Sequence, residues 1–302
     1  MSVCEEWTVS DDQWTHDTVE KNGVQLHVVT AGPEDGDLVV LLHGFPEFWY
    51  SWHHQIPTLA EAGYRVVAPD MRGYNCSEKP SGVDAYHIDE LVGDVAGLIR
   101  AFDRESAAVV GHDWGGLVAW QTAIDRPGVV DRLAVLNAPH PSAYGRALRS
   151  NPRQLAKSWY VFYFQLPVLP ELGLGWNDFA MLDRILGDGT VRPDAVTERD
   201  IERYKRALAR PGARTAALNY YRSLARRNAK LTLTRGGVGD LPVRVPTLLV
   251  WGEQDEALDI SLTEGLERWV PDIRVERLPD ASHWVQFDAP ERVSELLVEH
   301  LG

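Results

Sequence analysis

The chain has 302 residues, 44% of them hydrophobic and 25% charged, which allows one large α/β domain or one domain that carries an inserted segment. The formal net charge is −14, and no basic stretch offsets the acidic excess, so nucleic acid is not an expected partner. No apolar run approaches the roughly 20 residues of a membrane-spanning helix, and the start, MSVCEEWTVS, lacks the basic and apolar segments of a signal peptide.

The first third of the chain alternates strand and helix signals. Short continuous apolar runs predict strands that are buried on both faces of a mainly parallel sheet. Apolar residues at helical spacing, from Leu91 to Phe102, predict a helix over 89–103. The predicted strands of this part cover 24–32, 37–44, 64–70, 106–113 and 131–139.

The pattern changes between Pro141 and Arg235, where no strand signal occurs. This segment contains two aromatic clusters, at 158–167 and 218–227, and we predict that it is entirely helical. A glycine-rich hinge, RGGVGD, follows it. The last predicted elements are strands at 247–255 and 273–279 and an amphipathic helix at 290–301.

Alternating strands and helices imply an α/β fold with helices on both faces of the sheet. A helical segment inserted between two strands would cover the carboxyl ends of the sheet, where open sheets of this kind bind ligands. We therefore predict a core made of residues 1–139 and 236–302, with a helical cap formed by residues 140–235.

The string GHDWGG, residues 111–116, joins a predicted strand to a predicted helix. Gly111 and Gly115 would let the strand and the helix approach closely while the residue between them adopts a strained conformation. Asp113 could simply cap the helix. The spacing, however, is that of a nucleophile elbow, usually G-x-S-x-G, with Asp113 at the position of the serine.

In hydrolases with such an elbow, an acid and then a histidine follow the nucleophile along the chain. Asp255 comes at the end of a predicted strand, with Glu253 and Glu256 as weaker candidates, and His283 follows the last predicted strand. Asp255 could cap a helix and His283 could be an ordinary loop residue. Their order after Asp113 favours the catalytic interpretation.

Upstream, the string HGFPE follows another predicted strand. The backbone N–H of Phe45 is in position to form half of an oxyanion hole, and the N–H of Trp114 would form the other half. The site would then be built from loops at the ends of four strands.

The strings HGFPE, RGYNCSEKP, GHDWGG, NAPHP, GEQD and SHW together make the chain resemble the epoxide hydrolases of the α/β-hydrolase fold over nearly its whole length. The resemblance implies that fold, with Asp113 as nucleophile, Asp255 as acid and His283 as base. It also implies a cis peptide bond between Phe45 and Pro46 that aims the Phe45 amide inward.

Epoxide hydrolases of this kind carry two cap tyrosines that hydrogen-bond the epoxide oxygen. The register of the resemblance selects Tyr160 rather than Tyr163 in the first aromatic cluster, and Tyr221 rather than Tyr220 in the second. The alternative for any one of them is that its ring simply packs in the core.

A carboxylate suits attack on saturated carbon because a reference pKa of about 3.9 leaves it ionised at neutral pH. Attack on an epoxide would give an alkyl ester of Asp113. Water activated by His283 and Asp255 would hydrolyse the ester to a vicinal diol, while the Phe45 and Trp114 N–H groups stabilise the oxyanion. The expected activity is therefore that of an epoxide hydrolase.

The expected partners are water and a small apolar or aryl epoxide, because aromatic side chains favour apolar ligands. Phe45, Pro46 and Trp114 are the candidate pocket residues. We expect no cofactor and no metal ion: no HExxH motif occurs, and the adjacent His53 and His54 would point in different directions on a helix.

The same nucleophile would serve a haloalkane or haloacid dehalogenase. Haloalkane dehalogenases usually carry Asn where this chain has Phe45, and fluoroacetate dehalogenases carry Arg where it has Trp114, which disfavours both. A non-catalytic, ligand-binding member of the fold is the second alternative. No G-x-S-x-G occurs, so a serine esterase is excluded unless Asp113 is misassigned.

The two cysteines, Cys4 and Cys76, are too few for a disulfide scaffold, and we expect a cytoplasmic protein. The sequence leaves open whether the protein is a monomer or a homodimer.

Overall fold

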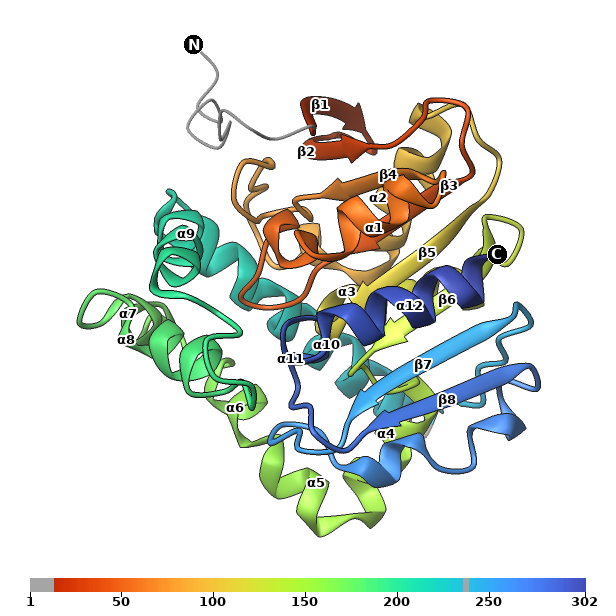
Figure 1. Cartoon of the computed structure of the whole chain (residues 1–302). Helices are drawn as coiled ribbons and strands as arrows, with labels where there is room; N and C mark the ends of the chain where they lie inside the picture. Colours follow the sequence, from red (N-terminus) through yellow and green to blue (C-terminus); the bar gives the residue numbers. More distant parts are fainter. Residues whose placement is uncertain (1–13, 236–238) are drawn as a thin grey trace.

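The structure is a computed structural model, and it describes residues 14–235 and 239–302 (Figure 1). The segment in which we expect no signal peptide therefore lies outside the described residues. The same is true of three residues of the glycine-rich hinge, 236–238. The described chain is built around an eight-stranded sheet with the order β1-β2-β4-β3-β5-β6-β7-β8. Strands β3 to β8 run parallel, whereas β2 is antiparallel to both of its neighbours. The strands are β1 (Thr15–Lys21), β2 (Val24–Ala31), β3 (Leu38–Leu42), β4 (Arg65–Pro69), β5 (Ala107–His112), β6 (Val130–Leu136), β7 (Thr247–Gly252) and β8 (Ile273–Leu278).

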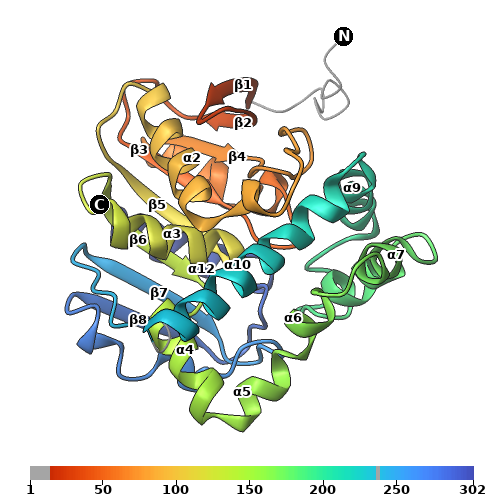
Figure 2. The same cartoon turned by 180° about the vertical axis from the view of Figure 1, so that it is seen from behind.

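Both faces of the central strands are covered by helices, which explains their continuous apolar sequences. In β3, Val40 and Leu42 point into one half of the core, and Val39 and Leu41 point into the other. Figure 1 shows α1 and α12 over one face, and Figure 2 shows α2 and α3 over the opposite face. These helices are α1 (Gln55–Glu61), α2 (Ile88–Ala101), α3 (Asp113–Asp125) and α12 (Pro290–Leu301).

Between β6 and β7 the described chain is helical. Figure 2 shows α10 crossing between the sheet and the helices α6 and α7. These helices are α4 (Pro141–Ser150), α5 (Pro152–Lys157), α6 (Trp159–Tyr163), α7 (Leu169–Gly175), α8 (Ala180–Leu182), α9 (Glu198–Ala209) and α10 (Ala213–Arg235). The fully buried Tyr220 on α10 donates from its hydroxyl to the carbonyl oxygen of Arg72, at 2.7 Å, and so ties this helix to the loop after β4. The division into a core of 1–139 and 236–302 and a cap of 140–235 stays our prediction.

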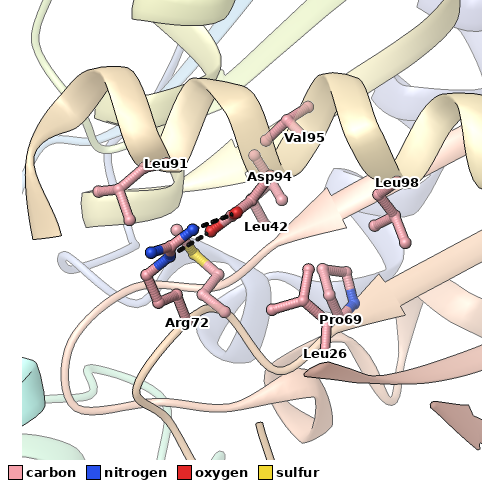
Figure 3. Close-up of a pocket in the computed structure, with 9 residues that line it drawn as sticks. Leu26, Leu42, Pro69, Arg72, Leu91, Asp94, Val95 and Leu98 are labelled. Carbon is pink, nitrogen blue, oxygen red and sulfur yellow. Dashed lines mark hydrogen bonds and ion pairs between the residues drawn. The ribbon is translucent and has the colours of Figure 1, made fainter. Parts of the chain in front are cut away.

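Arg72 also forms a buried ion pair that closes a small cavity under α2 (Figure 3). Its Nε and Nη2 atoms donate to the two carboxylate oxygens of Asp94 at 2.7 and 2.6 Å, a bidentate geometry. The cavity has a volume of about 20 Å³, which is the space that one water molecule needs. Leu91, Val95 and Leu98 form its apolar wall, so this cavity is a packing feature of the core.

The mainly parallel sheet with helices on both faces confirms the predicted fold class. Within the described ranges, no helix combines the length and the hydropathy that crossing a bilayer requires.

Candidate active site

Asp113 stands at the sharp corner between β5 and α3. Its backbone φ of 47° lies in the left-handed region, which non-glycine residues rarely adopt. The flanking glycines make the corner possible, since a Cβ on Gly111 would collide with the Gly115 carbonyl and a Cβ on Gly115 would collide with the Leu42 carbonyl. The carboxylate is turned toward a neighbouring loop, where it accepts a hydrogen bond from the Phe45 N–H.

A histidine and a second carboxylate lie beside Asp113. His283 Nδ1 is 2.7 Å from Asp255 Oδ2, and His283 Nε2 is 3.8 Å from Asp113 Oδ1. Asp255 is buried and also accepts from the Asn137 side-chain amide at 2.7 Å. The alternative acids at positions 253 and 256 are exposed. The folded chain therefore brings the three predicted triad residues together in the predicted order.

One of the two predicted N–H donors makes a hydrogen bond to the Asp113 carboxylate: the Phe45 N–H donates to Oδ2 at 2.9 Å. The Trp114 N–H lies beside the same carboxylate and acts to lower its pKa. The peptide bond between Phe45 and Pro46 is cis, as the resemblance implied. Because Oδ2 is held by an amide and Oδ1 faces His283, the two oxygens of Asp113 have different surroundings.

The charges of the site shift the pKa values of its members in opposing ways. Burial lowers the pKa of His283, but the carboxylates of Asp255, Asp113 and Glu47 outweigh burial and raise it to about 9. Burial raises the pKa of Asp113 above its ordinary value, although His283 and the N–H donors act in the other direction. At neutral pH the resting site thus holds an imidazolium between two carboxylates.

The raised pKa of His283 predicts a pH-dependent stability. The folded-state value of about 9 lies above the unfolded value of 6.5, so this stabilisation is complete below pH 6.5 and is lost as the pH rises through 9. Relative to a His283→Gln variant, we expect the free energy of unfolding of the wild type to fall by about 3 kcal/mol across this window. Urea unfolding at several pH values measures the difference, and a constant difference would contradict the raised pKa.

A buried polar network lies behind the triad, and the sequence analysis assigned it no role. Glu47 Oε2 accepts from the Gly44 N–H at 2.7 Å and lies 2.8 Å from His112 Nδ1. Gln286 donates to Glu47 Oε1 at 2.8 Å, and His112 Nε2 donates to the His283 carbonyl at 2.9 Å. Glu47 and His112 belong to the strings HGFPE and GHDWGG, so a polar side chain inside each motif was the available signal.

A cavity of about 110 Å³ opens onto Asp113 and Trp114, several times the space that one water molecule needs. Tyr160 and Tyr221, the two tyrosines that the register of the resemblance selects, both line it. The two rejected tyrosines do not line it: the Tyr163 hydroxyl donates to the Leu169 carbonyl, and the Tyr220 hydroxyl donates to Arg72 as described above.

Both cavity tyrosines are in a position to act as proton donors. Burial raises the pKa of each hydroxyl well above 10, so both remain protonated at neutral pH. The Tyr221 ring packs edge-to-face on the Trp114 indole, with their ring centroids 4.9 Å apart. The candidate pocket residues Phe45 and Pro46 are not on the cavity wall. The Phe45 ring instead packs on Tyr221, with their ring centroids 5.5 Å apart.

One group of residues in the described part of the chain has the spacing of metal ligands: His27, Asp70 and Cys76. Cys76 is in a disulfide, and the Asp70 carboxylate already accepts from the N–H groups of Trp49 and Cys76 and from the side-chain amide of Asn75. This group is therefore a hydrogen-bonding centre that braces the loop after β4, apart from the triad.

The profile of the alpha/beta hydrolase fold family matches residues 37–290, and the chain belongs to this family. Within the family, the chain is 46% identical to the AB hydrolase superfamily protein YfhM of Bacillus subtilis, covering 94% of this chain and 96% of that protein. It is 39% identical to epoxide hydrolase 1 of Caenorhabditis elegans, covering 96% and 70% of the two chains. The Bacillus megaterium epoxide hydrolase, solved in complex with an inhibitor, superposes with a TM-score of 0.87 at 34% identity, covering 94% and 99%. The resemblance to epoxide hydrolases is thus confirmed.

Proposed function

We propose that the protein is an epoxide hydrolase that opens an epoxide to a vicinal diol through a covalent ester on Asp113. The relatives named epoxide hydrolases support the activity. The observation that carries the proposal is the arrangement at the cavity floor. An Asp113 oxygen faces His283, and two protonated tyrosines, Tyr160 and Tyr221, line the same cavity.

In the first step, Asp113 Oδ1 attacks a ring carbon of the epoxide, and the bond from that carbon to the ring oxygen breaks. The electron pair goes to the ring oxygen, which takes a proton from the hydroxyl of Tyr160 or Tyr221. The products are a neutral hydroxy-ester and a tyrosinate, which takes up the proton that His283 releases. Because the carboxylate charge disappears, one of the groups that raise the pKa of His283 is lost, and the histidine becomes able to release its proton and to act as a base.

In the second step, His283 Nε2 takes a proton from water, and the water oxygen attacks the carbonyl carbon of the ester. The negative charge develops on Asp113 Oδ2, where the Phe45 N–H already donates in the resting protein. Collapse expels Oδ1 with the diol, which receives the proton back from His283. The carboxylic acid left on Asp113 then gives its proton to His283, which restores the resting site. Asp255 keeps the imidazole oriented through its bond to Nδ1.

The tyrosines distinguish this proposal from a dehalogenase that uses the same aspartate. An alkoxide leaving group needs a proton donor, whereas a halide ion needs only weak N–H donors. Two protonated tyrosine hydroxyl groups that line one cavity with Asp113 therefore favour an epoxide. The expected substrates are small apolar or aryl epoxides, because Trp114, Leu117 and Val161 also line the cavity.

A single turnover in ¹⁸O-labelled water tests the proposed chemistry, with protein in excess over styrene oxide. We expect the label in the peptide that contains residue 113 and not in the first diol, because water attacks the ester carbonyl. Label found in the diol alone would mean direct attack of water on the epoxide. Binding of the epoxide without any turnover would instead favour the non-catalytic alternative.

Tyr160→Phe and Tyr221→Phe are each expected to slow the opening of an epoxide about 10²-fold, because each removes one donor to the ring oxygen. Alkylation by a haloalkane should change much less. Rapid-quench measurement of ester formation gives both rates. Tyr163→Phe is the matched control, since the Tyr163 hydroxyl bonds the Leu169 carbonyl outside the cavity. An equal effect of all three substitutions would make the tyrosines packing residues only.

A cytoplasmic location and a mechanism without cofactor or metal ion are further parts of the proposal. The disulfide at Cys76 speaks against this location, because cytosolic proteins rarely keep disulfides. Thiol trapping in intact cells tests it, and reduced Cys76 would support the cytoplasmic location. Fully oxidised Cys76 in freshly trapped cells would place the protein in an oxidising compartment.

A further inference from the structure

One face of α10 forms a continuous side of the cavity. Tyr221, Leu224, Ala225 and Asn228 all line it, and their spacing of three or four residues puts them on the same side of the helix. Tyr221 marks the end of this face where the epoxide oxygen is expected. Asn228 marks the other end, seven residues later, which corresponds to ~10 Å along the helix axis.

The side-chain oxygen of Asn228 is buried and has no hydrogen-bond partner among the described residues. Two other polar side chains on the cavity wall are already paired: the Tyr144 hydroxyl and Ser158 Oγ lie 2.9 Å apart, and Ser158 Oγ also donates to the Gln154 carbonyl. Buried acceptors in folded proteins nearly always have a donor. The Asn228 oxygen is therefore an acceptor on the cavity wall that a ligand can satisfy.

The wall between the two polar ends is apolar. Leu224 and Ala225 separate Tyr221 from Asn228 on α10, and Leu148 and Leu258 come to the same cavity from α4 and from the loop after β7. A ligand that fills this space would be polar at both ends and apolar in between. Its far end must carry a hydrogen, because an amide oxygen can only accept.

We propose that Asn228 is a specificity-determining residue that accepts a hydrogen bond from a hydroxyl or N–H group at the far end of the substrate. The preferred substrates are then epoxides that carry such a donor on an apolar chain, ~10 Å from the ring oxygen. This inference rests on the proposed function and specifies the substrate class of the same site.

The test compares a terminal epoxydecane with its counterpart that carries a hydroxyl on the far carbon. For the wild type, we expect kcat/KM to be about tenfold higher for the hydroxyl-bearing epoxide, with the difference in KM. Asn228→Leu should abolish this preference, so that the two epoxides have equal kcat/KM values. Asn228→Asp, which keeps an acceptor oxygen at the same position, should retain the preference.

Thr232→Val is the matched control. Thr232 is exposed one turn further along α10 and does not line the cavity, so the preference should persist in this variant. Equal kcat/KM values for the two epoxides in the wild type, or a preference that survives in Asn228→Leu, would overturn the inference alone. Turnover of neither epoxide by the wild type would overturn the proposed function and this inference with it.

Discussion

An Asp113→Ala variant is expected to lose at least about 10⁴-fold in kcat/KM for an epoxide, because the substitution removes the atom that forms the covalent bond. No neighbouring carboxylate can replace it. Glu47 is held by the Gly44 N–H, His112 and Gln286, and Asp255 lies behind His283. Steady-state assays of diol formation, with the purified variant at high concentration, measure the remaining activity.

Asp125→Ala provides the matched control for Asp113→Ala. Asp125 is exposed at the far end of the same helix, α3, and its loss should leave kcat/KM unchanged. Circular dichroism and thermal unfolding should show that both variants are folded. Substantial turnover by folded Asp113→Ala protein would exclude residue 113 as the nucleophile.

A His283→Gln variant is expected to form the ester and then fail to hydrolyse it. Nucleophilic attack needs only Asp113, whereas the second step needs a base at the position of His283 Nε2, 3.8 Å from the carboxylate. Glutamine keeps a polar side chain but cannot take a proton from water. We expect the hydrolysis step to slow by about 10³-fold, and the intact protein to gain the mass of one substrate molecule.

Peptide mapping should place this added mass on residue 113. The double variant Asp113→Ala/His283→Gln is the control, and it should show no added mass under the same conditions. Added mass on the double variant would reveal unspecific alkylation. A single variant that stays unmodified while substrate is present in excess would argue against a covalent intermediate.

The core of the fold was predictable because its strands are buried on both sides. Strand β3, for example, consists of five consecutive apolar residues. The corner between β5 and α3 was predictable from the glycines on either side of Asp113. Strand β1 (Thr15–Lys21) was not predicted. It lies at the edge of the sheet, most of its residues are exposed, and its sequence THDTVEK has no apolar run or clear alternation.

The sequence predicted the parts of the site that follow from local spacing, but not those that depend on packing between distant segments. Gln286 and Glu47 are 239 positions apart in the sequence, and no local pattern predicts the hydrogen bond between their side chains. Phe45 was expected on the pocket wall because aromatic side chains line apolar pockets, yet its ring packs edge-to-face on Tyr221. Asn228 belongs to no motif, and its position on the cavity depends on how α10 crosses the sheet.

The unequal surroundings of the two Asp113 oxygens determine which oxygen atom enters each diol product. Oδ2 is retained by the Phe45 amide, so the oxygen delivered by water takes the vacated place of Oδ1. That newly acquired atom is the one that attacks the following epoxide. Each product molecule should therefore contain the solvent oxygen consumed one cycle earlier. Turnover in ¹⁸O-labelled water should place the label on the Asp113 carboxylate. When this labelled protein is transferred to ordinary water, the next diol that it forms should contain all of the label.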